Sequence, residues 1–345
     1  MTESKTREAL PQGSRTPRPV TLAPQEQVWR ARIKEMLGFD PDKSYGDLDL
    51  SYTFRDALFV YSLLLVVVGA SCALFVANGP IVLLLSPAFA LLSGIGFNWI
   101  NVQIHEASHG LLLRDRKWND IYCNVVLGSW ALQDVEIYRA THGMHHANLH
   151  TEKDPDLGIY TQHVGSSKAM LKGIAEDLLL FSAFRRNKQA RLFLAKHAVV
   201  LTGRPRYSFV AKLTAQSIVV AIYIYWCGLW GIALYGACYL FGLLAVFPVL
   251  VRIRTVVQHY GDELKSEDRP LPFISRTTVA PILESVLVGA RMDYHFEHHV
   301  YPTLPYYSLR KMHKKLKVAG LFEEDGGCPG LTTENYLKTY AYLAT

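Results

Sequence analysis

Residues 57–100 read ALFVYSLLLVVVGASCALFVANGPIVLLLSPAFALLSGIGFNWI and contain no Lys, Arg, Asp or Glu. A helix needs about 20 predominantly apolar residues to cross a bilayer, so this stretch has room for two transmembrane helices. Asn78-Gly79-Pro80, near its middle, is typical of a tight turn. The sequence therefore predicts one membrane-spanning helix at 57–77 and a second at 81–100.

A second charge-free stretch covers residues 213–251 and predicts the same arrangement. Cys227-Gly228 divides it into spans at 213–226 and 229–251. With 50% hydrophobic and only 19% charged residues, the composition excludes an ordinary soluble enzyme and a disordered chain. The five scattered cysteines form no CxxC pair and predict neither a disulfide framework nor a cysteine zinc site.

The positive charges indicate how the spans are oriented. All 36 Lys and Arg residues lie in the segments that flank the two apolar stretches. Because basic residues collect on the cytoplasmic side of a membrane, we expect a multi-pass integral membrane protein with both termini and residues 101–210 in the cytoplasm. The N-terminus lacks the apolar core of a signal peptide. The net charge of +6 is spread along the polar segments, which favours a lipid surface over nucleic acid as a partner.

The polar segments complete the expected domain organisation. Residues 1–24 are predicted to be a disordered tail and residues 25–56 an interfacial, amphipathic segment. Its apolar residues, from Trp29 to Leu37, recur at helical spacing and fit a membrane surface or the polar part of the protein equally well. Residues 57–315 are predicted to form the membrane domain, and residues 316–345 a cytoplasmic C-terminal segment. The expected fold is all-α, with four transmembrane helices in two hairpins and a cytoplasmic helical cap.

Three histidine clusters lie in the segments predicted to be cytoplasmic. They read HEASH (105–109), HGMHH (142–146) and HFEHH (295–299), an HxxxH box followed by two HxxHH boxes. Residues three or four apart lie on one face of a helix, so the histidines of each box can converge. In each HxxHH box the two adjacent histidines diverge by about 100°, so one box can serve two metal ions.

The number of histidines predicts a site with two metal ions. Imidazole is a ligand for zinc, copper, iron and nickel, and eight histidines are too many for one tetrahedral ion. His259 follows the last predicted span by about two helical turns and is expected to be a further ligand. The predicted metal ligands are His105, His109, His142, His145, His146, His259, His295, His298 and His299.

Carboxylates flank these boxes, and a metal-bound histidine usually donates its second N–H to a carboxylate or a carbonyl. The candidates for this role are Glu106, Asp154, Asp156, Asp293 and Glu297, although the two residues of the Asp154-Pro155-Asp156 segment also fit a simple turn. For His150 the sequence allows two interpretations, a residue that contacts the metal ligands or a surface residue. The histidines without patterned neighbours are expected to be solvated or locally hydrogen-bonded; they are His163, His197 and His313.

With HEASH, HGMHH and DYHFEHHVYP in this order, the chain resembles the integral-membrane fatty acid desaturase and hydroxylase superfamily over about residues 50–315. The resemblance implies a non-haem di-iron centre, with two Fe ions held by the nine predicted ligands, and O2 as co-substrate. It also implies a separate electron donor, such as a ferredoxin or cytochrome b5 with a reductase. The sequence has no HPGG motif or cysteine cluster that would indicate a fused donor domain.

The resemblance implies oxidation of unactivated C–H bonds in a membrane lipid or a lipid-like substrate. Acyl-chain desaturation is the leading hypothesis, and hydroxylation or ketonisation of an acyl, alkane or isoprenoid substrate is the alternative. We expect an apolar tunnel to the metal site, with Leu127, Trp130 and Phe247 as candidate wall residues. HEASH also satisfies the HExxH motif of a zinc protease, and paired histidines can hold haem, but neither hypothesis explains three boxes.

Overall fold

The structure is a computed structural model that describes residues 24–181, 206–261, 273–323 and 328–344, together with residues 184, 185, 192, 195 and 264. The predicted disordered tail, up to residue 23, and His197 lie outside the described residues. The described residues are mostly helical. The exception is a short parallel pair formed by β1 (Thr277–Thr278) and β2 (Thr332–Thr333).

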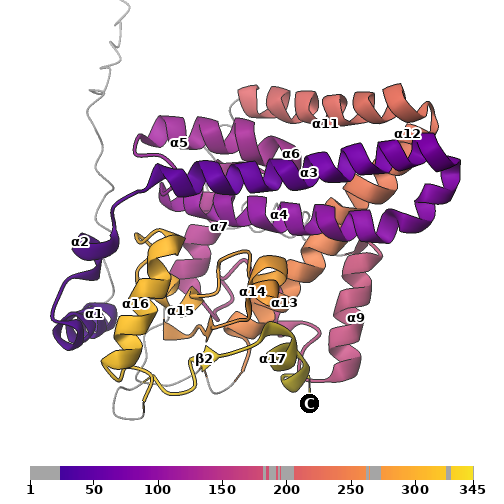
Figure 1. The fold of residues 1–345 in the computed structure, drawn as a ribbon. Helices are drawn as coiled ribbons and strands as arrows, with labels where there is room; N and C mark the ends of the chain where they lie inside the picture. The colour runs from indigo at the N-terminus through magenta and orange to yellow at the C-terminus, as the bar shows by residue number, and fades with distance from the viewer. Residues whose placement is uncertain are drawn as a thin grey trace, which may run out of the picture.

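The first apolar stretch folds as a helical hairpin. α3 (Leu50–Asn78) and α4 (Ser86–His109) lie side by side and run in opposite directions (Figure 1). The 3₁₀ turn η1 (Gly79–Leu85) joins them, and Gly79 ends α3 with a φ of 68°, a conformation that a side chain would strain.

Two helix ends differ from the ends of the predicted spans. α3 begins at Leu50, before residue 57, because Asp49 caps it by accepting a hydrogen bond from the Ser51 amide. Residues 81–85 lie in the turn η1, since α4 begins only at Ser86 with a proline in its first turn.

The second apolar stretch begins with α11 (Arg206–Cys227) and turns at Gly228, whose φ is 58°. A further run of helix follows, through α12 (Trp230–Leu234), the π-helical segments η3 (Tyr235–Leu240) and η4 (Gly242–Val246), and α13 (Phe247–His259). It continues past the predicted end at residue 251.

Three stretches of the described residues are long and apolar enough to cross a membrane: Leu50–His109, Arg206–Cys227 and Trp230–His259. The first contains both helices of the hairpin.

Small residues let these helices approach closely. A Cβ at Gly94 would lie 2.5 Å from Cγ1 of Val246, and a Cβ at Gly242 would lie 2.7 Å from the Ala90 carbonyl oxygen. Close backbone contact through small residues is common between membrane helices. It places α4 against η3 and η4 and brings the C-terminal ends of α4 and α13 near each other.

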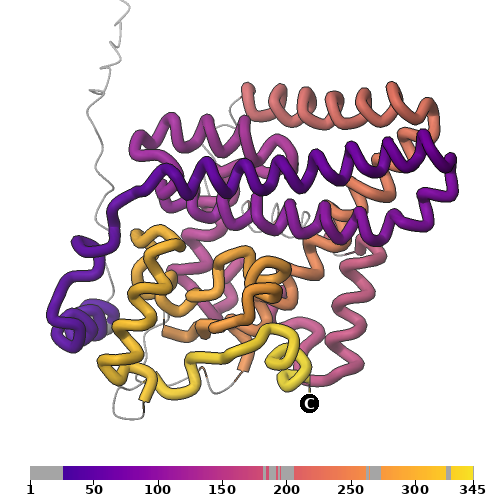
Figure 2. Tube along the Cα trace, in the orientation of Figure 1, coloured from indigo at the N-terminus to yellow at the C-terminus, as the bar shows by residue number. Residues whose placement is uncertain are grey.

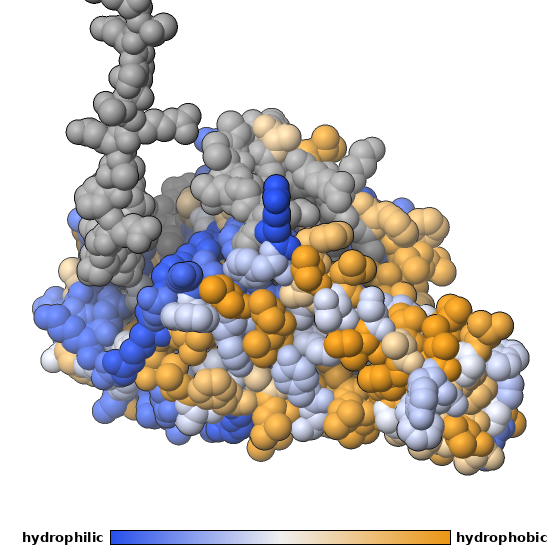
Figure 3. All heavy atoms as spheres, turned by 90° about the horizontal axis from the view of Figure 1, so that it is seen from above, coloured by the Kyte–Doolittle hydropathy of each residue, from blue (hydrophilic) through white to orange (hydrophobic). Residues whose placement is uncertain are grey.

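The surface of the long helices is apolar. Figure 3 shows that apolar side chains gather over the half of the molecule that holds the η1 turn and the break after α11, and polar side chains over the opposite end. Exposed examples are Leu58, Leu65, Leu84, Phe209, Leu213 and Leu229. An apolar surface of this extent suits lipid contact.

Most of the remaining elements gather on one side of the long helices, as Figure 2 shows. They are α1 (Pro24–Leu37), α2 (Pro41–Tyr45), α7 (Val135–Asn148), α8 (Leu157–Thr161), α9 (Ser167–Leu178), α14 (Ile282–Glu284), η7 (Ser285–Gly289), α15 (His295–Val300), α16 (Tyr306–Val318) and α17 (Tyr336–Tyr342). The segment of α5 (Arg116–Tyr122), η2 (Cys123–Gly128) and α6 (Ser129–Ala131) lies instead beside α3 and α11 (Figure 1). α1 packs on the protein, since Ile33 is buried and the Trp29 ring lies 5.0 Å from that of Phe273.

Candidate metal centre

The three histidine boxes lie on three helices that end or begin at one place. His105 and His109 form the last turn of α4, and Gly110 ends that helix in the left-handed conformation. The second box lies in the C-terminal half of α7, and the third box begins α15. His259 is the last residue of α13. The four helices thus bring histidines that are far apart in the sequence to one buried site.

The nine predicted ligands form two groups, and within each group one ring nitrogen of every histidine lies within 4.8 Å of the others. The five-histidine group is His105, His109, His142, His146 and His298. The four-histidine group is His145, His259, His295 and His299. The groups adjoin, because the rings of His146 and His299 stack with centroids 4.3 Å apart.

Each HxxHH box divides between the two groups. In the second box, His142 and His146 belong to the five-histidine group and His145 to the other. In the third box the pair one helical turn apart, His295 and His299, belongs to the four-histidine group, whereas His298 belongs to the five-histidine group. The divergence of adjacent side chains on a helix accounts for this division.

The donor atoms point inward. The Nε2 atom of His146 lies 2.9 Å from that of His142 and 3.0 Å from that of His298. In the other group, Nε2 of His295 lies 2.9 Å from that of His259 and 3.0 Å from that of His299. Such convergence of imidazole nitrogens, from residues that are buried or nearly so, fits a metal ion at the centre of each group.

The buried Nε2 atoms of His105 and His109 have no hydrogen-bond partner among the described residues, which leaves both free to bind a metal. Burial and the neighbouring imidazoles hold the pKa values of His142, His146 and His298 well below the usual range. These rings are therefore neutral at physiological pH, which is the form that ligates a metal.

Two of the predicted carboxylates orient a histidine of the site. Nδ1 of His145 lies 2.9 Å from Oδ1 of Asp154, and Nδ1 of His105 lies 3.2 Å from Oε1 of Glu106. Both contacts direct the opposite nitrogen, Nε2, toward the group. Burial alone would lower the pKa of His145, but the hydrogen bond and charge of Asp154 raise it. Asp156 lies farther away, with Oδ2 3.9 Å from the same Nδ1.

The structure gives the other two carboxylates different partners. Glu297 accepts a hydrogen bond from Thr277 and lies 2.6 Å from Nδ1 of His313. Asp293 accepts a hydrogen bond from the Ser285 hydroxyl. Among the described residues, neither carboxylate forms a hydrogen bond or an ion pair with a histidine of the two groups.

Two residues near the site were not recognised from the sequence. His313 holds the carboxylate in the middle of the third box, but it stands alone on α16, so spacing gives no signal for it. Tyr160 donates a hydrogen bond to Asp154 and its ring lies 5.2 Å from that of His259. His150 lies beside the site, with its ring 5.0 Å from Tyr160 and its amide donating to the Tyr160 oxygen. His163 forms a contact away from it, with Glu176.

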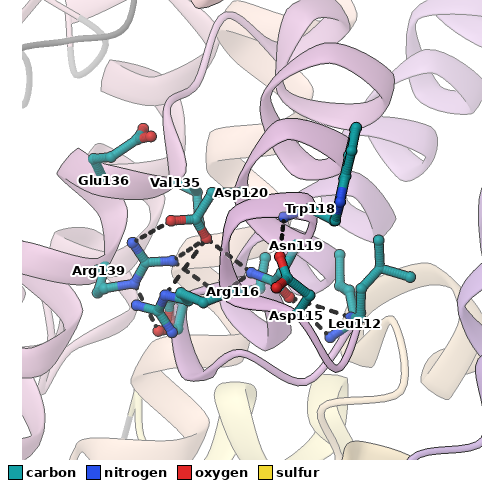
Figure 4. A network of polar contacts seen from close by, with 12 residues as sticks. Leu112, Asp115, Arg116, Trp118, Asn119, Asp120, Val135, Glu136 and Arg139 are labelled. Carbon is teal, nitrogen blue, oxygen red and sulfur yellow. Dashed lines mark hydrogen bonds and ion pairs between the residues drawn. The ribbon is translucent and has the colours of Figure 1, made fainter. Parts of the chain in front are cut away.

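A polar network fixes α7 against the end of α4 (Figure 4). The Arg139 guanidinium donates to both carboxylate oxygens of Asp120, at 2.6 and 3.0 Å, and to the carbonyls of Ala107 and Ser108. Asn119 binds the same Ala107 carbonyl from α5. Because Ala107 and Ser108 lie between the two histidines of the first box, this network sets the first box relative to the second.

A cavity of about 190 Å³ opens beside the histidines, between α4, α7, α8 and α13. Five histidines from both groups line it, as does Phe247, one of the predicted wall residues. Leu127 and Trp130 do not line this cavity. Leu127 is fully buried, and the Trp130 indole donates to the Tyr61 hydroxyl.

Comparison with known proteins is informative at this point. The sequence model of the family described as fatty acid desaturase matches residues 81–324, more than half of the chain. Dihydrorhizobitoxine desaturase of Bradyrhizobium elkanii is 25% identical over 67% of this chain and 67% of its own length. The zeaxanthin 4-ketolase of Chlamydomonas reinhardtii is 23% identical over 64% of this chain, but the match covers only 42% of the ketolase. An endoplasmic reticulum omega-3 fatty acid desaturase of Nicotiana tabacum is 24% identical over 78% of this chain and 72% of its own length.

Proposed function

The chain belongs to the fatty acid desaturase family and is an oxidoreductase, and we propose that it uses two iron ions and O2 to oxidise unactivated C–H bonds of a lipid-like substrate. The observation that carries the proposal is the pair of buried histidine groups. The five-histidine group offers more imidazole nitrogens than the four ligands that a zinc ion usually binds, and imidazole is a normal ligand of iron.

In this proposal each histidine group holds one iron ion. His105, His109, His142, His146 and His298 bind the first ion through one nitrogen each, and His145, His259, His295 and His299 bind the second. When bound, the two ions supply the oxidising chemistry with O2. The chain contributes the geometry, since Asp154 and Glu106 fix the rings of His145 and His105 through Nδ1.

The cavity beside the histidines is the proposed substrate site. It is lined by ligands of both groups and by apolar side chains of α13, so a C–H bond inside it faces the metal centre. The protein's main task is to hold the reacting carbon in position, because small displacements decide which product forms.

Acyl desaturation is our leading reaction and hydroxylation or ketonisation is the second candidate, favoured by the two relatives named as carotenoid ketolases. A zinc protease fits the geometry poorly. In an HExxH protease the glutamate faces the metal as general base. Here Glu106 lies at Nδ1 of His105, on the far side of the ring from the group, and also accepts a hydrogen bond from the Tyr306 amide.

We propose four transmembrane helices for this integral membrane protein: α3, α4, α11 and the α12–α13 run. The histidine groups then lie at the cytoplasmic ends of α4 and α13, together with both termini. A separate protein delivers electrons there. An interfacial position for residues 25–56 and a cytoplasmic one for residues 316–345 follow from the same topology, although the boundary at residue 315 falls inside α16.

The test is untargeted mass spectrometry of total lipids and small metabolites from cells that express the chain with a ferredoxin or cytochrome b5 reductase system. We expect products that lack two hydrogen atoms, or that have gained one oxygen atom, and we expect His298→Ala to abolish them. His163→Asn is the control, since His163 lies outside both groups and Asn tolerates its φ of 58°. Products that persist in His298→Ala would contradict the proposal.

A further inference from the structure

The cavity beside the histidines contains a buried arginine. Arg254 lies on α13, lines the cavity, and is only 7% exposed. The residues around it include Asn101, Tyr138 and Gln258, which also line the cavity. Arg254 precedes His259 by five residues, about 7.5 Å along the helix axis. A cationic group therefore lies close to the four-histidine group, inside a segment proposed to cross the membrane.

The partners of Arg254 are neutral. Its Nη1 donates to Oδ1 of Asn98 at 2.7 Å and lies 3.5 Å from the Gly289 carbonyl, and its Nη2 donates to Oδ1 of Asn101 at 3.3 Å. No carboxylate of the described residues forms an ion pair with it. Asp293 acts on it electrostatically from beyond ion-pair distance, and its Oδ2 accepts a hydrogen bond from Ser285.

Another arginine of α13 shows what a charge-compensated site looks like. Arg252 is 2% exposed, and its Nε donates to Asp177 at 2.6 Å in a buried ion pair. Arg252 does not line the cavity. The helix thus carries two buried guanidinium groups, one in an ion pair and one that faces the cavity without an ion pair, although the carboxylate of Asp156 also lines that cavity.

A buried guanidinium stays charged, and a buried charge that forms no ion pair is costly. The fixed partners do not relieve this cost fully, because they are dipoles, and they use only part of the five N–H donors of the group. They do hold it rigidly, since the amide nitrogen of Asn98 is itself bound to the Val288 carbonyl. A rigid cation with donors to spare is suited to bind an anion.

We propose that Arg254 binds the carboxylate of the substrate, so that the substrate is a free carboxylic acid oxidised at a carbon near its carboxylate. This inference rests on the proposed function and names its substrate class. Arg is the side chain best matched to a planar carboxylate. The apolar residues of the cavity, including Phe247, Val251 and Met292, are placed to contact the carbon chain.

The position of Arg254 decides which carbons of a bound acid meet the metal centre. Arg254 and the histidines of both groups line the same cavity. An acid bound by its carboxylate at Arg254 therefore presents its nearest carbons to the histidines, and not the middle of a long acyl chain.

Binding to the purified, iron-loaded protein tests this directly. The probes are the straight-chain acids from butanoate to decanoate and the corresponding primary amides, which have nearly the same shape but no charge. Calorimetry should show that at least one acid binds about 10- to 100-fold more tightly than its amide, the range expected for hydrogen bonds to a charged group. In Arg254→Gln the preference should disappear, with the acid and the amide bound equally.

Arg252→Lys is the matched control and should keep the wild-type preference. Arg254→Lys retains the positive charge but not the planar guanidinium, so it should keep part of the preference for the acid. It also serves as a second variant in case Arg254→Gln does not fold. Iron content and the elution volume in detergent identify variants that are folded. Equal binding of acid and amide by the wild type, no binding of any acid, or an unchanged preference in Arg254→Gln would overturn the inference.

These failures differ from a failure of the proposed function. If the acids do not bind but His298-dependent oxidation of an esterified lipid is observed, the oxidase assignment stands and only the carboxylate site is wrong. A wild-type protein that neither binds iron nor oxidises a lipid-like substrate would contradict the proposed function itself.

Discussion

Asp154→Asn is expected to weaken metal binding in the four-histidine group alone. Asp154 is 4% exposed, its Oδ1 lies 2.9 Å from Nδ1 of His145, and its Oδ2 accepts the hydroxyl of Tyr160. The substitution keeps the shape of the side chain but removes its charge. A hydrogen bond to a charged group is worth about 1.5–3 kcal/mol, which corresponds to roughly a 10- to 100-fold loss of affinity.

The assay loads the purified protein with iron and titrates it with a chelator while the iron retained per chain is measured. Asp154→Asn should release half of its iron, the ion of the four-histidine group, at a chelator concentration about 10- to 100-fold lower than the wild type requires. Asp156→Asn is the control, because Asp156 lies 3.9 Å from the same nitrogen and its side chain is 41% exposed. Its effect should stay within about 1 kcal/mol, as for other exposed charge pairs.

Equal release curves for Asp154→Asn and the wild type would refute the reasoning, as would an equal loss of both iron ions. The first result would mean that the carboxylate does not support the ring of His145. The second would mean that the two histidine groups do not bind metal separately.

Three further results are expected. Gly242→Ala should lower the thermal unfolding temperature, because the new Cβ would lie 2.7 Å from the Ala90 carbonyl oxygen. A Cβ at Gly236 would have no atom within 4 Å, so Gly236→Ala should be neutral or stabilise the protein by up to about 1 kcal/mol. A larger loss of stability in Gly236→Ala than in Gly242→Ala would contradict the packing. Arg139→Met should lower both stability and iron content, because it removes two hydrogen bonds from the part-buried carboxylate of Asp120 and two from the carbonyls of Ala107 and Ser108. Iron content equal to that of the wild type would show that this network does not position the boxes. His313→Phe should lower the free energy of unfolding, measured by denaturant titration, by about 1–3 kcal/mol, since Glu297 is fully buried and loses a hydrogen-bond partner. An unchanged free energy of unfolding would show that His313 does not stabilise the Glu297 carboxylate.

The membrane helices could be predicted because two stretches free of charge have no other stable environment. Their ends could not be predicted so well, because Asp49 and Gly79 set them by local hydrogen bonding and backbone conformation that hydropathy does not report. The stretch from Trp230 also continues as helix to His259, and most residues after 251 are buried although several of them are polar.

The histidine boxes could be predicted from spacing, because residues one turn apart share a helix face. The division of each HxxHH box between two groups follows from the same rule. The partners of the carboxylates could not be predicted, since Glu297 meets His313 and Asp293 meets Ser285 only through tertiary packing. Arg254 gave no signal in the sequence, because its significance depends on the neutral side chains that bind it and on the cavity that it lines in the folded protein.

Mössbauer spectroscopy of protein purified from cells grown on ⁵⁷Fe, together with the iron content per chain, tests the central claim most directly. If the five- and four-histidine groups each hold iron, the wild type should contain two ions per chain with distinguishable signals. His259→Ala should then reduce or remove one signal and leave the other. One iron per chain, zinc in place of iron, or loss of both signals in equal measure in His259→Ala would contradict two separate iron sites.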